Sequence, residues 1–322
     1  MKNIEIISTG RAVPSKVVTN DDLAKIVDTN DEWISTRTGI RERRFCGEEE
    51  SATTLAVEAA RKALEASQLA PSDIGACICA TISGDYATPS MACLVQRELG
   101  LREPIPTLDV NAACSGFLYG IEVARGLLNG CGEKYALVVG CEQLSKLLDM
   151  TDRSTCVLFG DGSGAAIVRL SEDATYASTL GARGGFEINV EGAGHGTSHI
   201  HMQGQEVFKF ATSIIPVCIR QLQEKSGLSV EDVSRVVCHQ ANERIIDSVV
   251  RRMKADPDKF YKNMDRFGNT SAASVPIALD ELVEKGDIKA GDMLMMVGFG
   301  AGLTWAGAVI RYMPSPRGEG GA

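Results

Sequence analysis

The sequence of 322 residues is poor in aromatic residues and contains no long apolar run. Phe, Trp and Tyr together make up 5% of the chain, whereas hydrophobic residues of all kinds make up 44%. A core of small aliphatic side chains favours closely packed α/β layers over a β-sandwich. No apolar run reaches the roughly 18–20 residues that cross a membrane, and the N-terminus lacks the apolar core of a signal peptide. We therefore expect a cytoplasmic protein with no membrane partner.

Positive charge and histidine are also scarce. Lys and Arg number 33 against 42 Asp and Glu, which gives a net charge of -9, so the electrostatics do not favour nucleic acid as a partner. His195, His199 and His201 lie in a Gly-rich stretch with no cysteine nearby to complete a zinc set, which favours an exposed loop over a metal site. The ten cysteines are scattered, which indicates reduced thiols and neither a disulfide framework nor a zinc site.

Strand and helix patterns alternate along the chain, as in an α/β fold with a largely buried sheet. Asn20 and Asp31 are the predicted N-caps of the first two helices. We predict strands at residues 4–7, 76–82, 107–112, 135–140, 165–170, 233–238, 293–298 and 304–312, and helices at residues 20–27, from 32 onward, and at 53–66, 89–99, 115–129, 204–225, 241–254 and 271–285.

The two halves of the chain end alike. Residues 159–169 and 298–311 each contain a Gly-rich turn that leads into a final strand of small residues, which suggests a duplicated α/β unit. Residues 172–200 are Gly-rich, and we expect them to be irregular. We therefore place the boundary there and predict an N-terminal half over residues 1–171 and a C-terminal half over residues 172–322.

Cys114 stands where a predicted strand runs directly into a predicted helix. The N-terminus of a helix carries partial positive charge and unpaired N–H groups, which favour the thiolate, so we expect the pKa of Cys114 to fall. Its small neighbours Ala112, Ala113 and Gly116 leave room for a substrate. The alternative is a buried structural cysteine, and this segment alone favours neither interpretation.

His239 and Asn269 each lie in a turn between predicted elements. Taken singly, His239 is most simply a structural histidine and Asn269 a cap or turn residue. Together with Cys114 they supply a nucleophile and two polar partners. A papain-like protease has the same Cys–His–Asn order, but the cysteine signature of those enzymes is missing around Cys114, and their cysteine lies near the mature N-terminus.

With these motifs in view, the chain resembles β-ketoacyl-[acyl-carrier-protein] synthase III, the initiating condensing enzyme of type II fatty-acid synthesis, over about residues 2–313. The resemblance implies a thiolase-like α/β fold with two duplicated halves in a layered α-β-α-β-α arrangement. The first half would carry the nucleophilic cysteine, and the second the histidine and the asparagine. The segments that carry the resemblance are residues 28–43, 112–117, 152–155, 159–162, 239–242 and 268–274.

The resemblance also implies a mechanism. Cys114 would attack an acyl-CoA primer and hold the acyl group as a thioester, which divides one difficult step into two. A malonyl thioester on acyl carrier protein would then enter, and hydrogen bonds from His239 and Asn269 to its carbonyl would stabilise the enolate formed as carbon dioxide leaves. The carbanion would attack the acyl-cysteine and give a 3-ketoacyl product. No metal or other cofactor is implied, because decarboxylation generates the nucleophile.

Further residues receive binding roles only through the resemblance. Thr88 would line the acyl pocket of the neighbouring subunit of a homodimer. The CoA-binding set would be Trp33, Arg37, Thr38, Arg153, Gly204, Phe208 and Asn242. Without the family, Trp33 would merely pack, Arg37 and Arg153 would be solvated, and Asn242 would be an N-cap.

A basic surface is implied for docking of the acidic carrier protein. Arg244, Arg251 and Arg252 are spaced by seven and eight residues, so they share one face of a helix, and Lys209 would lie near them in the family fold. The alternative is an ordinary solvated helix face.

The Gly-rich turn departs from the family pattern at two positions. Ala301 and Ala306 stand where relatives have glycine. In the family, the backbone N–H at position 301 joins that of Cys114 in the oxyanion hole. We expect a negative φ at Ala301, since the methyl group is tolerable if only the N–H must face the site. Thr88 is smaller than the Phe of acetyl-specific relatives, which hints at a roomier acyl pocket.

Several related functions stay open. A condensing or acyltransfer enzyme of a polyketide or signalling pathway would carry the same three residues. A thiolase uses a second cysteine near the C-terminus, but no cysteine follows Cys238. A hydroxymethylglutaryl-CoA synthase needs a glutamate acid/base, for which no matching motif is present. An inactive carrier-binding scaffold would have no use for Cys114, His239 and Asn269 together.

Overall fold

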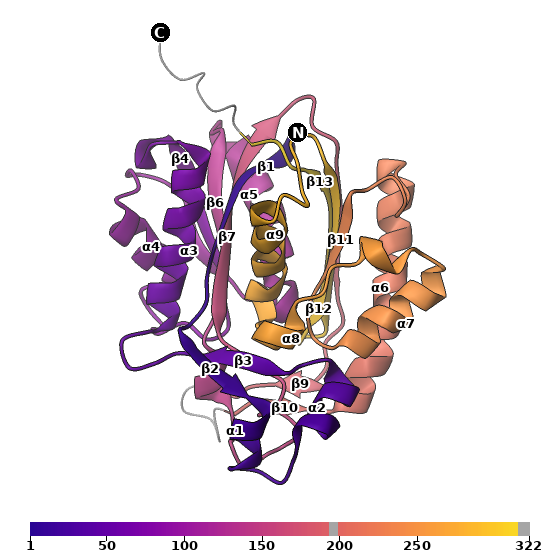
Figure 1. Ribbon diagram of the computed structural model, residues 1–322. Helices are drawn as coiled ribbons and strands as arrows, with labels where there is room; N and C mark the ends of the chain where they lie inside the picture. Colours follow the sequence, from indigo (N-terminus) through magenta and orange to yellow (C-terminus); the bar gives the residue numbers. More distant parts are fainter. Residues whose placement is uncertain (193–198, 315–322) are drawn as a thin grey trace.

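The computed structural model describes residues 1–192 and 199–314, and two central sheets carry its fold (Figure 1). The first sheet has five strands in the order β1-β7-β6-β4-β5, and the second has four in the order β11-β12-β13-β8. The strands of the first are β1 (Asn3–Ala12), β4 (Ile74–Ala80), β5 (Thr107–Val110), β6 (Tyr135–Glu142) and β7 (Gly162–Ser171). Those of the second are β8 (Tyr176–Ala182), β11 (Arg235–Cys238), β12 (Met293–Gly300) and β13 (Thr304–Arg311).

The two sheets repeat one topology. In each sheet, the last strand of that half of the chain lies between the first strand of the half and the strand that comes directly before it in sequence. Thus β7 pairs antiparallel with β1 and β6, and β13 pairs antiparallel with β8 and β12. The next pair is parallel in both, β4 with β6 and β11 with β12. Only β5 has no counterpart among the described residues. The predicted duplication and layered α/β fold are thus confirmed, while the boundary between residues 171 and 172 stays a prediction.

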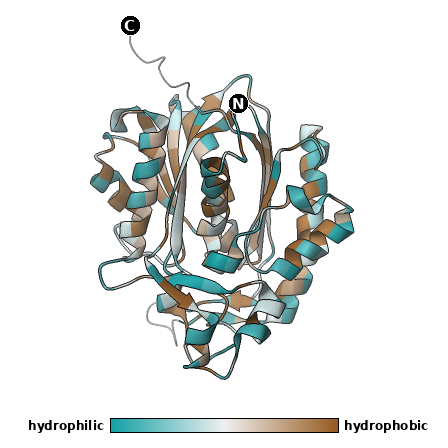
Figure 2. Cartoon of the chain, viewed as in Figure 1, coloured by the Kyte–Doolittle hydropathy of each residue, from teal (hydrophilic) through white to brown (hydrophobic). Residues whose placement is uncertain are grey.

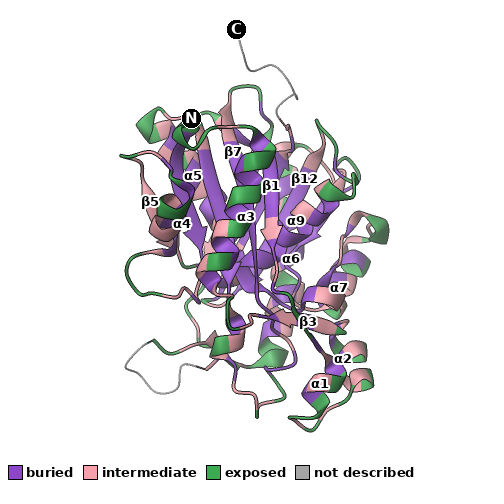
Figure 3. Cartoon of the chain, turned by 60° about the vertical axis from the view of Figure 1, so that its left-hand side comes forward, coloured by how far each residue is buried: buried purple, intermediate pink, exposed green. Residues whose placement is uncertain are grey.

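Helices form three layers around these sheets (Figures 1 and 3). On the outer side of the first sheet lie α3 (Ala52–Ser67) and α4 (Met91–Leu99), and on the outer side of the second lies α6 (Gly204–Ser226), with α7 (Glu243–Met253) packed beside it. Between the sheets lie α5 (Gly116–Cys131) and α9 (Ser274–Glu284). Hydrophobic residues concentrate on the strands and on the helix sides that face them (Figure 2). No helix in the described part of the chain is long and apolar enough to cross a membrane.

The middle layer approaches the first sheet closely because glycines remove side chains from the contact. A Cβ at Gly140 on β6 would lie 2.3 Å from the carbonyl oxygen of Ala272, and one at Gly164 on β7 would lie 2.7 Å from the backbone N of Ile277. Real Cβ atoms do not come so close to backbone. The strand glycines therefore allow the start of α9 to lie close to β6 and β7. This close approach also sets the position of the turn that precedes α9.

Three local predictions were wrong. Thr19 caps α1 (Asn20–Ala24) through a bond from the Asp22 N–H, and Asn30 caps α2 (Asp31–Thr38), so each N-cap lies one residue before the predicted one. The stretch 172–200 contains strand β8, which belongs to the second sheet. Because β8 is rich in Ala, Ser, Thr and Gly, it lacks the apolar run that marks a buried strand.

The short elements were also missed. A two-stranded sheet joins β2 (Lys16–Thr19) to β3 (Glu42–Phe45), and another joins β9 (Ile188–Asn189) to β10 (His201–Met202). The remaining short helices are α8 (Met264–Phe267), η1 (Pro71–Asp73), η2 (Ala113–Ser115), η3 (Leu144–Leu147), η4 (Pro257–Lys259) and η5 (Ser271–Ala273).

The close approach of α9 can be tested at Gly164. Gly164→Ala should destabilise the fold by about 1–3 kcal/mol, because the new methyl group meets the backbone of residues 276 and 277. Gly126→Ala is the matched control: Gly126 lies inside α5 with nothing within 4 Å of an added Cβ, and its change should stabilise by about 0.4–1 kcal/mol. Urea unfolding measures both. Equal effects of the two substitutions would contradict this account of the packing.

Candidate active site

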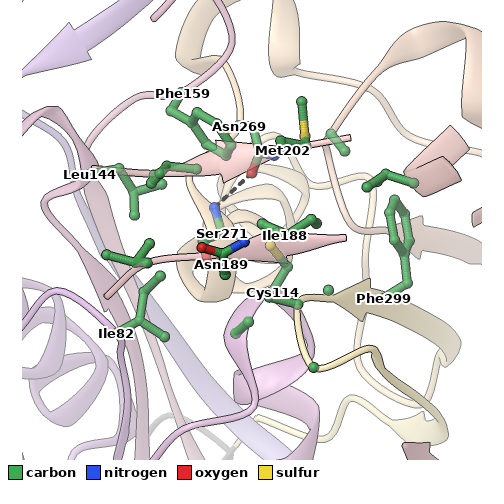
Figure 4. A pocket seen from close by; sticks show the side chains of 18 of the residues that line it. Ile82, Cys114, Leu144, Phe159, Ile188, Asn189, Met202, Asn269, Ser271 and Phe299 are labelled. Carbon is green, nitrogen blue, oxygen red and sulfur yellow. Dashed lines mark hydrogen bonds between the residues drawn. The ribbon is translucent and has the colours of Figure 1, made fainter. Parts of the chain in front are cut away.

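A cavity of about 750 Å³ opens between the two halves, and Cys114, His239 and Asn269 all line it (Figure 4). The cysteine comes from the first half of the chain, and the histidine and asparagine come from the second. The sequence-predicted catalytic residues therefore line one cavity, although 125 residues separate Cys114 from His239 along the chain. Much of the remaining wall is apolar and includes Ile82, Leu144, Phe159, Ile188, Met202 and Phe299.

Cys114 sits in η2, the turn between β5 and α5, and is partly exposed to the cavity. The turn is tight, with Ala113 at φ +46°. Burial raises the pKa of the Cys114 thiol to about 12, the negative charge of Glu142 adds to the rise, and the Ser271 hydroxyl partly offsets it. The expected fall in pKa is therefore wrong: removal of the thiolate from water outweighs the N-terminus of α5.

His239 follows β11, and two hydrogen bonds to other residues hold it in place, one made by its backbone and one by its imidazole ring. Its N–H donates to the carbonyl of Val297 at 2.8 Å, and its Nδ1 lies 2.6 Å from the hydroxyl of Ser274. Ser274 Oγ also accepts the N–H of Gln240 at 3.4 Å. In the tautomer in which Ser274 donates its hydroxyl proton to Nδ1, the imidazole proton resides on Nε2. Burial lowers the pKa of His239 to about 3, so the ring is neutral at pH 7.

Asn269 is fixed by backbone and side chain together. Its backbone N–H donates to the carbonyl of Leu158 at 2.8 Å, and its carbonyl accepts the N–H of Gly160 at 3.0 Å. Its Oδ1 accepts the N–H of Ser271 at 2.9 Å (Figure 4). The amide oxygen is thereby occupied, and Nδ2 is the end left to serve the cavity. Asn269 and His239 can thus each present a neutral N–H donor to the cavity that Cys114 also lines.

The Gly-rich turn between β12 and β13 closes against Cys114. A Cβ at Gly300 would lie 2.6 Å from the Cys114 N, so only glycine allows the turn to approach this closely. The positive φ values of the described residues include Gly302, at +129°, but not Ala301, so alanine fits at 301 without left-handed strain, as expected. Ala306 is buried in β13 opposite Gly298, where a methyl group is accommodated.

A smaller cavity of about 320 Å³ adjoins the first. Gly204, Phe208 and Asn242 line both cavities, and the smaller one adds three basic residues, which are Arg37, Lys209 and Arg244. Asn242 is also the N-cap of α7: its Oδ1 accepts the Arg244 N–H at 2.9 Å, while its Nδ2 donates to the Arg37 carbonyl at 3.1 Å. The capping interpretation of Asn242 is therefore correct, and the residue faces the cavities as well.

Trp33 lies among basic side chains outside both cavities. The Arg37 and Arg153 guanidinium carbons lie 4.7 and 5.3 Å from the centre of its ring. Thr38 is different, because it is buried and its hydroxyl donates to the Ile34 carbonyl at 2.7 Å. The hydroxyl thus completes the end of α2, and the place of Thr38 in the CoA-binding set stays a prediction.

The other predicted residues lie on the surface. Thr88 is exposed and lines neither cavity, and its predicted role in a neighbouring subunit stays a prediction. Arg251 and Arg252 are exposed in the last turn of α7, and Lys209 pairs with Glu206 at 2.7 Å.

The histidine cluster is only partly visible. His195 lies outside the described residues, His199 is half-buried and His201 is exposed in β10. Within residues 1–192 and 199–314, no group of three or more His, Cys, Asp or Glu is placed to hold a metal ion.

Sequence reasoning assigned no role to Ser271, Ser274 and Glu142. Glu142 ends β6, is fully buried, and accepts a hydrogen bond from the Ser271 hydroxyl at 3.0 Å. Burial raises the pKa of Glu142 to about 7. One signal was available: an acidic residue directly after the apolar run of residues 135–141 is unusual for a buried strand.

The fold and the cavity together define a condensing enzyme of the thiolase-fold class. The sequence profile described as 3-Oxoacyl-[acyl-carrier-protein (ACP)] synthase III matches residues 108–184, and that of its C-terminal part matches residues 223–312. The chain belongs to this family, also named β-ketoacyl-[acyl-carrier-protein] synthase III. A family member from Oceanobacillus iheyensis is 45% identical over 317 residues, which cover 96% of this chain and 99% of the relative.

Solved structures agree with the assignment. The crystal structure of 3-oxoacyl-[acyl-carrier-protein] synthase III from Aquifex aeolicus has a TM-score of 0.91 at 43% identity, with 96% of this chain and all of the other covered. The priming β-ketosynthase of the R1128 polyketide pathway has a TM-score of 0.92 at 33% identity, with 98% of both chains covered.

The fit of alanine in the Gly-rich turn can be tested directly. Ala301→Gly should lower stability by about 0.4–1 kcal/mol, since φ at 301 suits alanine and glycine adds entropy to the unfolded chain. Denaturant unfolding measures the change, and the condensation rate should stay within a few-fold of the parent enzyme. A gain in stability or a large rise in rate would mean that Ala301 strains the turn.

Proposed function

We propose that the protein catalyses the decarboxylative condensation of an acyl-CoA primer with malonyl-[acyl-carrier protein], which gives 3-ketoacyl-[acyl-carrier protein] and initiates fatty-acid synthesis. Membership in the β-ketoacyl-[acyl-carrier-protein] synthase III family supports this acyltransferase activity. The single observation that carries the proposal is the cavity in which a cysteine thiol lies with two neutral N–H donors, His239 and Asn269.

In the first half-reaction, Cys114 would attack the thioester of the primer. The backbone N–H groups of Cys114 and Ala301 are our proposed oxyanion hole, because the turn at Gly300 lies against the backbone of Cys114. Preorganised donors of this kind stabilise the negative charge of a tetrahedral intermediate. The apolar wall around Ile82 and Leu144 would receive the acyl chain.

In the second half-reaction, His239 and Asn269 would polarise the malonyl thioester carbonyl. Both can act as donors: when Ser274 donates to Nδ1, the proton of His239 resides on Nε2, and Ser271 occupies the oxygen of Asn269. The enolate formed by loss of carbon dioxide then attacks the acyl-cysteine. The proposed chemistry uses no metal or cofactor, because decarboxylation itself supplies the nucleophile.

The smaller cavity suits the phosphates and pantetheine of CoA and of the carrier. Arg37, Lys209 and Arg244 surround the smaller cavity, and Gly204 and Phe208 continue into the larger one. We propose that Trp33 and Arg153 stack on the adenine of CoA. For this to happen, the adenine must displace a guanidinium group from the face of the Trp33 ring. A homodimer, to which Thr88 would contribute its acyl-pocket contact, and a cytoplasmic location complete the proposal.

One alternative is a priming condensation in polyketide synthesis. The structural similarity to the R1128 priming β-ketosynthase supports this alternative, since the same cavity residues would serve both pathways. Assays of a panel of acyl-CoA primers with malonyl carrier from each pathway distinguish the two.

The nucleophile is tested by acyl transfer alone. Mixed with acyl-CoA in the absence of malonyl carrier, the parent enzyme should gain the mass of one acyl group, and Cys114→Ala should gain none. Cys238→Ala, which removes a buried cysteine that does not line the cavity, is the control and should still be acylated. An adduct that persists on Cys114→Ala would overturn the assignment.

The two donors should act in the second half-reaction. His239→Ala and Asn269→Ala should still be acylated, whereas release of carbon dioxide from malonyl carrier should fall on the order of 10²–10³-fold. Mass spectrometry follows the first step and labelled carbon dioxide the second. Variants that decarboxylate normally but cannot be acylated would reverse these roles.

The basic face of α7 should accelerate binding of the acidic carrier. Arg251→Glu with Arg252→Glu should raise the KM for malonyl carrier on the order of tenfold at low salt, with little change for acyl-CoA and a smaller effect at high salt. Arg61→Glu with Arg97→Glu makes the same charge change on α3 and α4, on the opposite outer layer, and is the control. An equal KM increase in both pairs would indicate a general charge effect and no docking face.

A further inference from the structure

One residue of the segment 239–242 has no part in the proposed reaction. His239, Ala241 and Asn242 line the cavity, whereas Gln240 does not, and Gln240 is only 1% exposed. A glutamine amide carries two N–H donors and an accepting oxygen, and each of them needs a partner once the side chain is removed from water. The partners of this amide therefore show which parts of the chain it holds together.

All three partners of the Gln240 amide are main-chain groups. Its Nε2 donates to the carbonyl of Cys238 at 2.7 Å and to the carbonyl of Tyr261 at 3.1 Å. Its Oε1 accepts the N–H of Asn263 at 2.9 Å. Because two partners are carbonyls and the third is an N–H, only one orientation of the amide satisfies all three bonds. Gln240 therefore joins the last residue of β11 to the segment 261–263.

The bonds of Gln240 lie on both sides of His239 in the chain. Its side chain holds the carbonyl of the residue before His239. Its own N–H donates at 3.4 Å to Ser274 Oγ, which lies 2.6 Å from Nδ1 of the imidazole. The other contacts of His239 come from β12, where Val297 accepts its N–H and the Phe299 ring lies edge-on with its centre 5.2 Å away. Gln240 thus links the main chain around His239 to a segment that neither β12 nor Ser274 reaches.

The segment 261–263 is itself anchored to α9. Asn263 is 2% exposed, and its Nδ2 donates to Glu281 Oε2 at 3.0 Å. Glu281 is buried on α9 and also accepts both terminal nitrogens of Arg266, at 2.5 and 2.9 Å. Such a two-bond pair between a guanidinium and a carboxylate fixes geometry as well as charge. Because α9 also carries Ser274, the segment and the partner of the imidazole keep one spacing.

We propose that Gln240 is a positioning residue for His239. Its three side-chain bonds set the course of the main chain at the end of β11, and thereby the direction in which the imidazole presents Nε2 to the malonyl thioester carbonyl. This inference rests on the proposed function, in which His239 donates to that carbonyl. A displacement of about 1 Å at a reacting group can lower a rate on the order of 10²-fold, so a residue outside the cavity can control the step.

The two half-reactions separate positioning from folding. Gln240→Met keeps the length of the side chain but removes its three bonds, and it should lower release of carbon dioxide from malonyl carrier by about 10–100-fold. Acylation of Cys114, followed by mass spectrometry on the same sample, should stay within a few-fold, because that step does not use His239 in the proposed function. Gln240→Asn keeps the amide on a shorter side chain and should give the same split with a smaller loss.

Gln221→Met is the matched control. Gln221 is a half-buried glutamine of α6 that lines neither cavity, and its Oε1 accepts the hydroxyl of Thr179 on β8 at 2.6 Å. The substitution removes a side-chain bond between two elements without touching the main chain around His239, so both half-reactions should stay within a few-fold of the parent enzyme. A selective loss of decarboxylation as large as that of Gln240→Met would overturn the inference.

Combination with the donor variants shows through which residue Gln240 acts. His239→Ala removes the imidazole, so adding Gln240→Met should lower release of carbon dioxide by less than about twofold further, since coupled sites are not additive. Asn269→Ala leaves the imidazole in place, so adding Gln240→Met there should still lower the rate by about 10–100-fold. An equally large further loss in both backgrounds would mean that Gln240 does not act through His239 and would overturn the inference.

The outcomes separate this inference from the proposed function. If the parent enzyme is not acylated by acyl-CoA, or releases no carbon dioxide from malonyl carrier, the proposed function fails. If the parent enzyme does both, but Gln240→Met and Gln240→Asn lose acylation and decarboxylation in equal proportion, Gln240 serves only to hold the fold and the positioning role alone is overturned. Unchanged decarboxylation in both variants would overturn it as well.

Discussion

The active site depends on how closely backbone segments approach one another at the centre of the molecule. Added Cβ atoms at Gly140, Gly160 and Gly300 would lie 2.3, 2.3 and 2.6 Å from backbone atoms of facing segments. These contacts bring the turn before α9 against β6, fix Asn269 to the strand-like segment around residue 159, and press the Gly-rich turn onto Cys114. Because side chains are absent at these points, the positions of the three reactive groups are set by main chain, which is stiffer than side-chain packing.

Close packing also determines the chemistry, because it removes water. Burial raises the pKa of Cys114 and lowers that of His239, so both groups are neutral in the free site. A neutral imidazole with its proton on Nε2 is a hydrogen-bond donor and a weak base. The site therefore resembles a pair of oxyanion donors beside a thiol, and it differs from the thiolate–imidazolium pair of cysteine proteases. That difference explains why a Cys–His–Asn order in sequence was ambiguous until the environment of each group was known.

Apolar periodicity predicted the alternating strands and the long helices, whereas the layered arrangement and the joint roles of Cys114, His239 and Asn269 were implied by the resemblance to the family. It failed for β8, whose small polar residues pack without an apolar run. Sequence reasoning also failed for the pKa of Cys114. Local sequence reveals the helix that follows the thiol but not the burial that opposes it, since burial is produced by segments up to 186 residues away, such as the turn at Gly300.

Duplication of the fold gives this site two equivalent strand ends with opposite electrostatic character. β6 and β12 hold the same place in their sheets, each parallel to one neighbour and antiparallel to the last strand of its half. β6 ends at Glu142, whose negative charge raises the pKa of Cys114, and β12 ends at Gly300, whose turn lies against the backbone of Cys114. The two equivalent strand ends therefore meet at the cysteine with different chemistry, a buried carboxylate from one half of the chain and a backbone turn from the other.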